Sequence, residues 1–196
     1  MGIDRLSEWL SKFGYGQYTG IDLSEERSGL MPTREWKQKR YKKPWYQGDT
    51  IPVGIGQGYW TATPIQMSKA LNTLINDGNM KVPHLLNSTR INGQLVPYKQ
   101  QDAVQIGDIH SGYWEIAKDG MYGVANRANG TAHKYFANAP YKIAAKSGTA
   151  QVFGYETYNA HTLAEHLRDH KLMTAFAPYD NPQVSVAIIL ENGGAG

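Results

Sequence analysis

The sequence predicts an α+β fold in which helices cover both faces of an antiparallel sheet. Strands are predicted at residues 141–153, 172–177 and 184–190, which are rich in small, β-branched and aromatic residues. Because segments that follow one another along a chain usually pair, we expect consecutive antiparallel strands of one sheet, with residues 141–153 at a free edge. Residues 184–190 carry apolar side chains on both faces, which is typical of a central strand with helices on either side.

The composition limits the classes of function that are possible for this chain. A chain of 196 residues can bury a good core as one domain or belong to a larger one. Its formal net charge of +3 and its 19% of charged residues describe an ordinary surface, which argues against a nucleic-acid binder. The absence of cysteine excludes a disulfide framework and a thiolate metal site. No apolar run approaches the ~18 residues that span a bilayer and no signal peptide is evident, so we expect any membrane anchor to lie outside this sequence.

Two amphipathic helices are predicted in the first half of the chain. In the first, Asp4 is placed to cap the helix and Gly14 to end it. Its apolar residues at helical spacing are Leu6, Trp9, Leu10 and Phe13. The second begins with a capping box at residues 63–66, which has proline at the first helical position, and Gly78 is placed to end it. Its apolar stripe is Met67, Ala70, Leu71, Leu74 and Ile75.

The remaining elements are shorter or less distinct. Residues 15–30 are expected to form a loop or short strands. Residues 82–97 predict a hairpin whose turn is Asn92-Gly93. A helix is predicted at residues 109–126, and the loop at residues 129–132 leads from it towards the strand at residues 141–153.

Three segments carry weaker indications of binding. The basic run at residues 37–46 suits nucleic acid or acidic lipid, but we interpret it as a solvated loop because no further basic surface continues it. The glycines at residues 54–58 lack the Lys-Ser/Thr of a phosphate loop. A short helix predicted at residues 161–170 carries His166 and His170 four positions apart. Without H-E-x-x-H or a third ligand, we interpret both as solvated histidines rather than metal ligands.

The clearest candidate site lies within residues 141–153. Side chains alternate along a strand, so Lys146 and Gly148 lie on one face, and Ser147 and Thr149 on the other. Gly148 leaves room for an approaching backbone, and an edge strand can pair with an extended peptide. One ammonium and two hydroxyls suit a carboxylate. For these residues alone, a lysine on a solvated strand is the alternative interpretation.

Several separated motifs, taken together and in order, resemble those of class B penicillin-binding proteins. They are residues 48–58, 63–66, 130–132 (Gly-Thr-Ala), 146–151 (Lys-Ser-Gly-Thr-Ala-Gln) and 191–194 (Glu-Asn-Gly-Gly). The first four residues of the 146–151 motif are of the K-T-G type that accompanies an S-x-x-K nucleophile motif. The resemblance covers essentially all 196 residues, and residues 36–40 and 169–176 add a match to the cell-elongation members. It implies the penicillin-binding transpeptidase and serine β-lactamase-like fold.

One departure from the family pattern is large. No serine in the chain begins S-x-x-K, S-x-N or S-x-D, so the nucleophile, its lysine base and the second serine motif are missing. The family places both motifs before the residues matched by positions 1–13. We therefore expect residues 1–196 to be the carboxy-terminal part of a single transpeptidase domain, inactive by itself.

The resemblance also implies a mechanism and roles. An activated serine attacks the D-Ala-D-Ala end of a peptidoglycan stem peptide, and β-lactams mimic that donor. Lys146 would supply positive potential near the donor carboxylate, which the hydroxyls of Ser147 and Thr149 would hold. The Thr149 N–H would be one oxyanion donor. The catalytic candidates are thus Lys146 and Thr149. The substrate-binding candidates are Lys146, Ser147, Gly148, Thr149, Ala150 and Gln151.

Partners and location follow from the same resemblance. It implies peptidoglycan stem peptides and β-lactam antibiotics as ligands, and a membrane glycosyltransferase and elongation-complex scaffold proteins as partners. It indicates no cofactor, metal or nucleic acid for this stretch. The expected location is the periplasmic face of the bacterial inner membrane. Two alternatives stay open: a related serine β-lactamase, and a non-catalytic peptidoglycan-binding or scaffold module, which only the missing serine supports.

Overall fold

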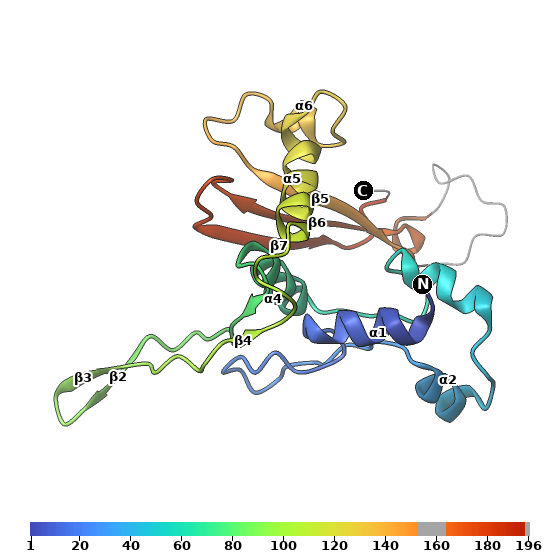
Figure 1. Ribbon diagram of the computed structural model, residues 1–196, viewed down its shortest axis with the longest axis horizontal. Helices are drawn as coiled ribbons and strands as arrows, with labels where there is room; N and C mark the ends of the chain where they lie inside the picture. Colours follow the sequence, from blue (N-terminus) through green and yellow to red (C-terminus); the bar gives the residue numbers. More distant parts are fainter. Residues whose placement is uncertain (153–163, 195–196) are drawn as a thin grey trace. The chain divides into compact units, whose positions relative to one another are not determined.

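The computed structural model describes residues 1–152 and 164–194 (Figure 1). The chain divides into two compact units, Met1–Ser111 and Gly112–Gly196. Each unit is considered by itself below. In the described ranges, no helix is both long and apolar enough to cross a membrane.

The longest regular elements of the first unit are helices. Its helices are α1 (Ile3–Lys12), α2 (Arg34–Tyr41), the 3-10 helix η1 (Gln47–Asp49), α3 (Thr50–Gly54) and α4 (Pro64–Ile75). Two short antiparallel pairs complete it: β1 (Asn79–Met80) with β4 (Val104–Gln105), and β2 (Ser88–Ile91) with β3 (Gln94–Pro97). The β2–β3 hairpin forms the end of an extended arm of this unit (Figure 1). Its turn is made by Asn92 and Gly93, with φ of 49° and 83°, which confirms the predicted hairpin.

Gln66 joins the start of α4 to the preceding loop. The predicted capping box is confirmed, because the Thr63 hydroxyl accepts from the backbone N–H of Gln66 and the side-chain oxygen Oε1 of Gln66 accepts from the Thr63 N–H. The side chain of Gln66 is almost fully buried. Its amide nitrogen donates to the backbone carbonyls of Gln17 at 2.7 Å and Ser28 at 2.6 Å. A single side chain thus caps the helix and fastens the loop at residues 15–30 to it.

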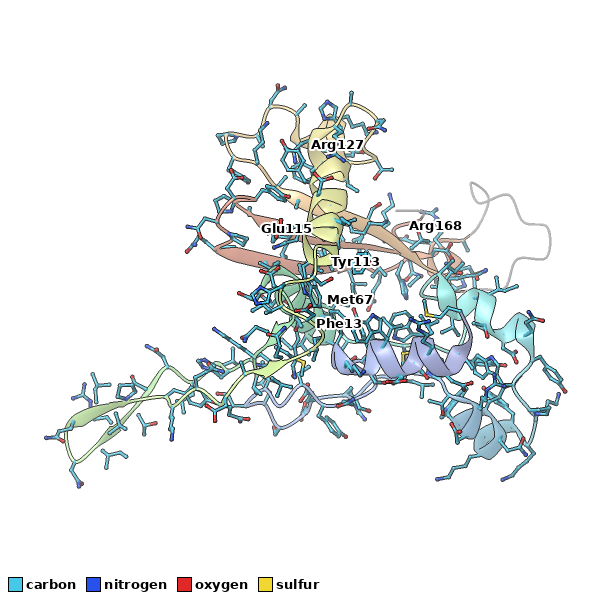
Figure 2. All side chains as sticks on the ribbon, in the orientation of Figure 1. Phe13, Met67, Tyr113, Glu115, Arg127 and Arg168 are labelled. Carbon is cyan, nitrogen blue, oxygen red and sulfur yellow. The ribbon has the colours of Figure 1, made fainter. Side chains whose placement is uncertain are left out.

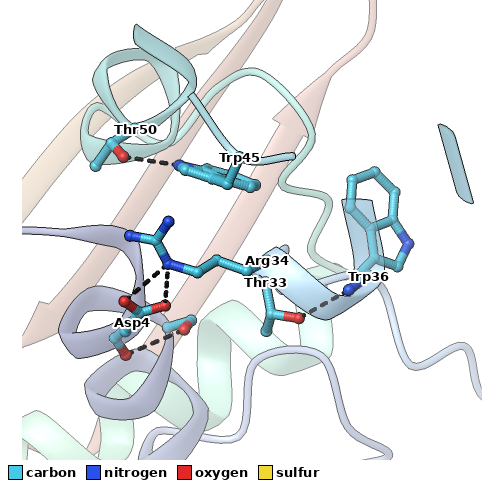
Figure 3. A network of polar contacts seen from close by, with 7 residues as sticks. Asp4, Thr33, Arg34, Trp36, Trp45 and Thr50 are labelled. Carbon is cyan, nitrogen blue, oxygen red and sulfur yellow. Dashed lines mark hydrogen bonds and ion pairs between the residues drawn. The ribbon is translucent and has the colours of Figure 1, made fainter. Parts of the chain in front are cut away.

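Asp4 does not cap α1, contrary to the prediction. The N-cap is Gly2, and no side chain caps this end. Asp4 instead lies in the first turn, where both carboxylate oxygens accept from Nε of Arg34 at 2.8 and 2.9 Å (Figure 3). Because both carboxylate oxygens of Asp4 bind Arg34, this carboxylate does not cap the helix.

The basic run at residues 37–46 agrees only in part with the predicted solvated loop, because residues 38–44 are exposed but Lys37 is buried. It begins inside α2, and Lys37 is only 3% exposed. The Lys37 ammonium pairs with the Asp49 carboxylate and lies 4.7 Å from the ring centre of Tyr46 and 5.8 Å from that of Trp45. A carboxylate and aromatic faces replace the water that a buried ammonium loses.

The second unit contains the three strongly predicted strands. Its elements are α5 (Tyr113–Asn126), α6 (His133–Phe136), β5 (Ala144–Ala150), η2 (Glu165–Leu167), β6 (His170–Ala177) and β7 (Val184–Leu190). The strands pair antiparallel in the order β5-β6-β7, as predicted. β5 is shorter than the predicted strand at residues 141–153, whose last residue lies outside the described residues. α5 likewise begins later than predicted, at Tyr113.

Small residues let α5 pack closely on the sheet. Ala125 of α5 is buried against Ala145 of β5 and Ala175 of β6, and Val124, Phe136 and Ile143 surround them. The α+β class with an antiparallel sheet is therefore confirmed. The prediction that residues 184–190 form a central strand is wrong for the described residues. There β7 pairs only with β6, and Ile188 is 50% exposed.

The predicted helix at residues 161–170 is also wrong where it is described. Residues 161–163 lie outside the described residues. After them come the short 3-10 helix η2 and then β6, which begins at His170. His166 and His170 therefore do not share a helical face. Within the described ranges, no group of three or more His, Cys, Asp or Glu side chains is placed to hold a metal ion.

Candidate functional site

The candidate residues lie on β5 at the edge of the described sheet. Lys146, Ser147 and Thr149 are paired with Thr174, Met173 and Lys171 of β6, respectively. In the part of the chain that the structure describes, β6 is the only strand paired with β5. The backbone groups on the other edge are therefore not used by a described strand, as the peptide-binding prediction requires.

The pairing assigns the side chains to two faces. Ser147 and Thr149 share a face with Ala145, against which α5 packs. Lys146 lies on the opposite face, is exposed, and donates from its ammonium to the carbonyl of Ser147. A carboxylate at the strand edge could thus be contacted from both faces.

Gly148 has a neighbour that the sequence did not reveal. A Cβ at this position would lie 3.3 Å from Cβ and 3.6 Å from Cδ1 of Leu172, its partner on β6. The missing side chain therefore makes room for Leu172 on the same face of the sheet. The predicted room for a ligand backbone concerns the free edge, so the two reasons for a glycine are distinct.

The loop at residues 129–132 places Thr131 near the strand. A Cβ on Gly130 would lie 2.3 Å from the carbonyl oxygens of Gly123 and Val124, so only glycine fits against the last turn of α5. Ala132 donates its N–H to the Val124 carbonyl at 3.0 Å. Thr131 and Ser147 then line a cavity of about 260 Å³, whose other walls come from Ala132, Tyr135, Lys171, Leu172, Met173, Ile188 and Leu190.

The site offers binding groups rather than a complete catalytic set. An ammonium, two hydroxyls and an available strand edge can bind an anionic extended peptide. The side chains at residues 146–149 do not include a serine of the S-x-x-K pattern, which is absent from the sequence. The covalent chemistry of a serine transferase would need that residue from elsewhere.

Sequence reasoning placed the candidate residues correctly relative to one another. Lys146 to Ala150 lie on β5, and Gln151 directly follows it. It missed the hydrogen bonds that Asp169 and Asn192 make at this end of the sheet. Both lie inside segments matched to the family, but their hydrogen bonds join residues distant in the sequence, such as Val152 with Asp169.

The family is decided by a match over the whole chain. A family model described as "Penicillin binding protein transpeptidase domain" matches residues 1–196. The chain belongs to this transpeptidase family. It is 81% identical over 199 residues to the "Peptidoglycan D,D-transpeptidase MrdA" of Escherichia coli (strain K12). The match covers 100% of this chain but 31% of that relative, so the chain spans about a third of its length.

Solved structures of penicillin-binding proteins share the fold. The crystal structure of Pseudomonas aeruginosa PBP2 in complex with WCK 5153 has a TM-score of 0.81 at 43% identity, covering 100% of this chain and 40% of that one. A complex between PBP2 and MreC from Helicobacter pylori has a TM-score of 0.81 at 31% identity, covering 100% and 33%. These matches confirm the resemblance to penicillin-binding transpeptidases. The similarity to PBP2 proteins agrees with the match of residues 36–40 and 169–176 to the cell-elongation members of the family.

Proposed function

We propose that this chain is the substrate-binding part of a peptidoglycan D,D-transpeptidase domain. The observation that carries the proposal is the position of Lys146, Ser147 and Thr149 at the β5 edge of a chain that matches the transpeptidase domain throughout. We place the nucleophilic serine outside these 196 residues, because no serine here has the required neighbours.

The donor stem peptide would lie along the outer edge of β5. Its terminal carboxylate accepts hydrogen bonds from the hydroxyls of Ser147 and Thr149, and Lys146 adds positive potential from the opposite face. Backbone groups of residues 149–151 pair with the peptide, as an added strand would. This arrangement fixes the D-Ala-D-Ala bond relative to a nucleophile held by another segment.

The reaction then follows acyl transfer through serine. The serine oxygen attacks the carbonyl of the penultimate D-Ala, and the terminal D-Ala leaves as the amine. The acyl group passes to the amine of a neighbouring stem. While the tetrahedral carbonyl carries negative charge, the N–H of Thr149 donates to it as one of two oxyanion donors, and Lys146 stabilises the same charge at longer range.

The surrounding assembly is proposed from relatives. The Helicobacter pylori structure is a complex of PBP2 with MreC, and a further neighbour at 32% identity is described as a peptidoglycan synthase complex. We propose similar scaffold proteins and a membrane glycosyltransferase as partners, at the periplasmic face of the inner membrane. The Lys146 edge requires no cofactor for the steps above.

A chimera tests the proposal in a complete domain. This chain replaces the stretch that it matches in the Escherichia coli relative, and the purified chimera is incubated with a fluorescent penicillin. We expect one covalently bound penicillin per chimera by intact-mass measurement. We expect no adduct on the isolated 196-residue chain. A chimera that folds but forms no adduct contradicts the proposal, and rapid hydrolysis of the penicillin favours the β-lactamase alternative.

A further inference from the structure

The end of the sheet next to residues 149–151 is held by a polar cluster that the proposed mechanism does not use. We call it the strand-end clasp and define it as Asp169, His170, Asn192 and Gly194. These residues lie at the start of β6 and just after β7. Their hydrogen bonds join the ends of all the strands in the described sheet.

Asp169 ties β5 to the segment that follows β7. It is 9% exposed, and its Oδ1 accepts from the N–H of Val152 at 3.2 Å. Its own carbonyl accepts from the N–H of Gly194 at 2.9 Å. Val152 comes directly after Gln151, the last residue of the candidate substrate-binding set. The carboxylate of Asp169 therefore fixes the backbone at the point where β5 ends.

Asn192 makes the matching connection from β7 to β6. Its backbone N–H donates to Nδ1 of His170 at 2.9 Å, and its side-chain amide donates to the carbonyl of Arg168 at 3.0 Å. Arg168 is labelled in Figure 2, next to the start of β6. Asn192 has a φ of 53°, a left-handed conformation that asparagine tolerates better than most residues. Both its backbone conformation and its side chain suit this position.

The two positions after Asn192 require glycine for separate reasons. A Cβ on Gly193 would lie 2.8 Å from Cδ2 of Leu190, the last residue of β7. Gly194 has a φ of 83° and brings its N–H to Asp169. The sequence Asn-Gly-Gly is thus the sequence of a tight turn that returns the chain onto the start of β6.

The sheet register places this turn at the same end of the sheet as residues 149–151, with β6 between the turn and β5. His170 lies opposite Ala150, and Lys171 lies opposite both Thr149 on β5 and Leu190 on β7. The clasp therefore begins at the residue pair next to Thr149. The bond from Val152 to Asp169 is separated from Thr149 by Ala150 and Gln151 alone.

We propose that Asp169 and Asn192 are positioning residues for acylation, which hold the backbone of residues 149–151 where the donor peptide and its oxyanion need it. The inference rests on the proposed function and assigns these side chains no contact with substrate. A misplacement of about 1 Å in a reacting geometry can lower a rate on the order of 100-fold, so a loosened strand end affects the chemical step.

The test compares two substitutions of Asp169 in the chimera. Asp169→Asn keeps an oxygen that can accept from Val152, whereas Asp169→Ala removes it. Asp180→Ala is the matched control, since Asp180 is exposed in the turn between β6 and β7, at the opposite ends of these strands. Stopped-flow measurements with a fluorescent penicillin separate the dissociation constant of the initial complex from the acylation rate constant. Thermal melts check folding.

We expect Asp169→Ala to lower the acylation rate constant about 10- to 100-fold, and Asp169→Asn to restore it to within a few-fold of the parent. Asp180→Ala is expected to behave as the parent. If Asp169→Ala fails to fold, Asn192→Gly takes its place, because glycine keeps the left-handed turn and removes only the bond to Arg168. We expect Asn192→Gly to slow acylation several-fold relative to the parent chimera, which carries asparagine at this position.

The outcomes separate this inference from the proposed function. A parent chimera that folds but is never acylated contradicts the proposed function itself. A parent that is acylated normally, with Asp169→Ala and Asn192→Gly acylated at the same rate, overturns the positioning role alone. Equal losses in Asp169→Asn and Asp169→Ala also overturn it, because they indicate that charge rather than the hydrogen bond to Val152 matters.

Discussion

Gly148 and Leu172 are cross-strand partners so close that a Cβ on Gly148 would lie 3.3 Å from the Cβ of Leu172. This contact is tighter than ordinary van der Waals packing, so an alanine at position 148 requires either Leu172 or β5 to move. The shift needed is only a few tenths of an ångström, so we expect Gly148→Ala to lower acylation of the chimera by about 3- to 10-fold, through displacement of Thr149 on β5. The second-order rate of acylation by a fluorescent penicillin measures the effect.

A double substitution separates the two reasons for this glycine. If Leu172 is the obstacle, Gly148→Ala combined with Leu172→Gly, which removes the Cβ at the close contact, recovers part of the lost rate, and the two effects are not additive. Leu172→Gly alone controls for the loss of packing. Strictly additive losses would indicate that the glycine is needed by the ligand on the free edge instead.

Lys146 gives the second prediction. In a site with limited water, one ammonium near a carboxylate and a developing oxyanion is expected to contribute on the order of 2–4 kcal/mol, by analogy with the loss of one positioned electrostatic donor. Lys146→Ala in the chimera should therefore slow acylation roughly 30- to 1000-fold. Thermal melts exclude unfolding. A folded variant within about threefold of the parent would show that Lys146 is a solvated strand residue.

Two ion pairs of the first unit give a matched comparison of stability. Lys37 and Asp49 have side chains that are 4% and 18% exposed, whereas Arg34 and Asp4 are 50% and 67% exposed. Breaking a buried pair leaves an uncompensated charge and costs about 3–5 kcal/mol, but an exposed pair contributes at most about 1 kcal/mol. In the chimera, we expect Asp49→Asn to lower the melting temperature of the transpeptidase domain clearly more than Asp4→Asn. Equal shifts would contradict the burial of Lys37.

The ion pair between Lys37 and Asp49 also predicts that the stability of the domain depends on pH in the acidic range. The hydrogen bond from Lys37 lowers the pKa of Asp49 below its ordinary value of 3.8, with a further contribution from the Tyr46 N–H. A carboxyl whose pKa is lower when folded adds stability above its unfolded pKa. That stability is lost as the pH falls through the folded pKa. Melting temperatures measured from pH 6 to 3 should therefore fall less steeply for Asp49→Asn than for the parent. Parallel curves would refute this.

Local patterns predicted those elements whose cause is local. The hairpin turn at Asn92 and the capping box at Thr63 depend on residues within a few positions, and both are found. The alternation in residues 184–190 gave the bounds of β7 without error. The faces of Lys146 and Ser147 followed from the same two-residue period.

The wrong predictions concern residues whose contacts depend on a partner that is distant in the sequence. Asp4 pairs with Arg34, and Lys37 is buried because Asp49 and aromatic rings surround its ammonium. No periodicity within a single segment carries this information. The strand-end clasp is of the same kind, since Asp169 and Asn192 bond to residues 17 and 24 positions away. Only the register of the sheet reveals that these residues lie at the same end of the sheet as Thr149.

The most direct measurement is a crystal structure of the chimera acylated by a penicillin. If the β5 edge binds the donor, the drug's carboxylate oxygens should lie about 2.7–3.0 Å from the hydroxyl oxygens of Ser147 and Thr149, and the acyl carbonyl should accept from the Thr149 N–H. An acylated chimera whose drug carboxylate is bound away from residues 146–151 would contradict the central claim that this strand is the substrate-binding edge.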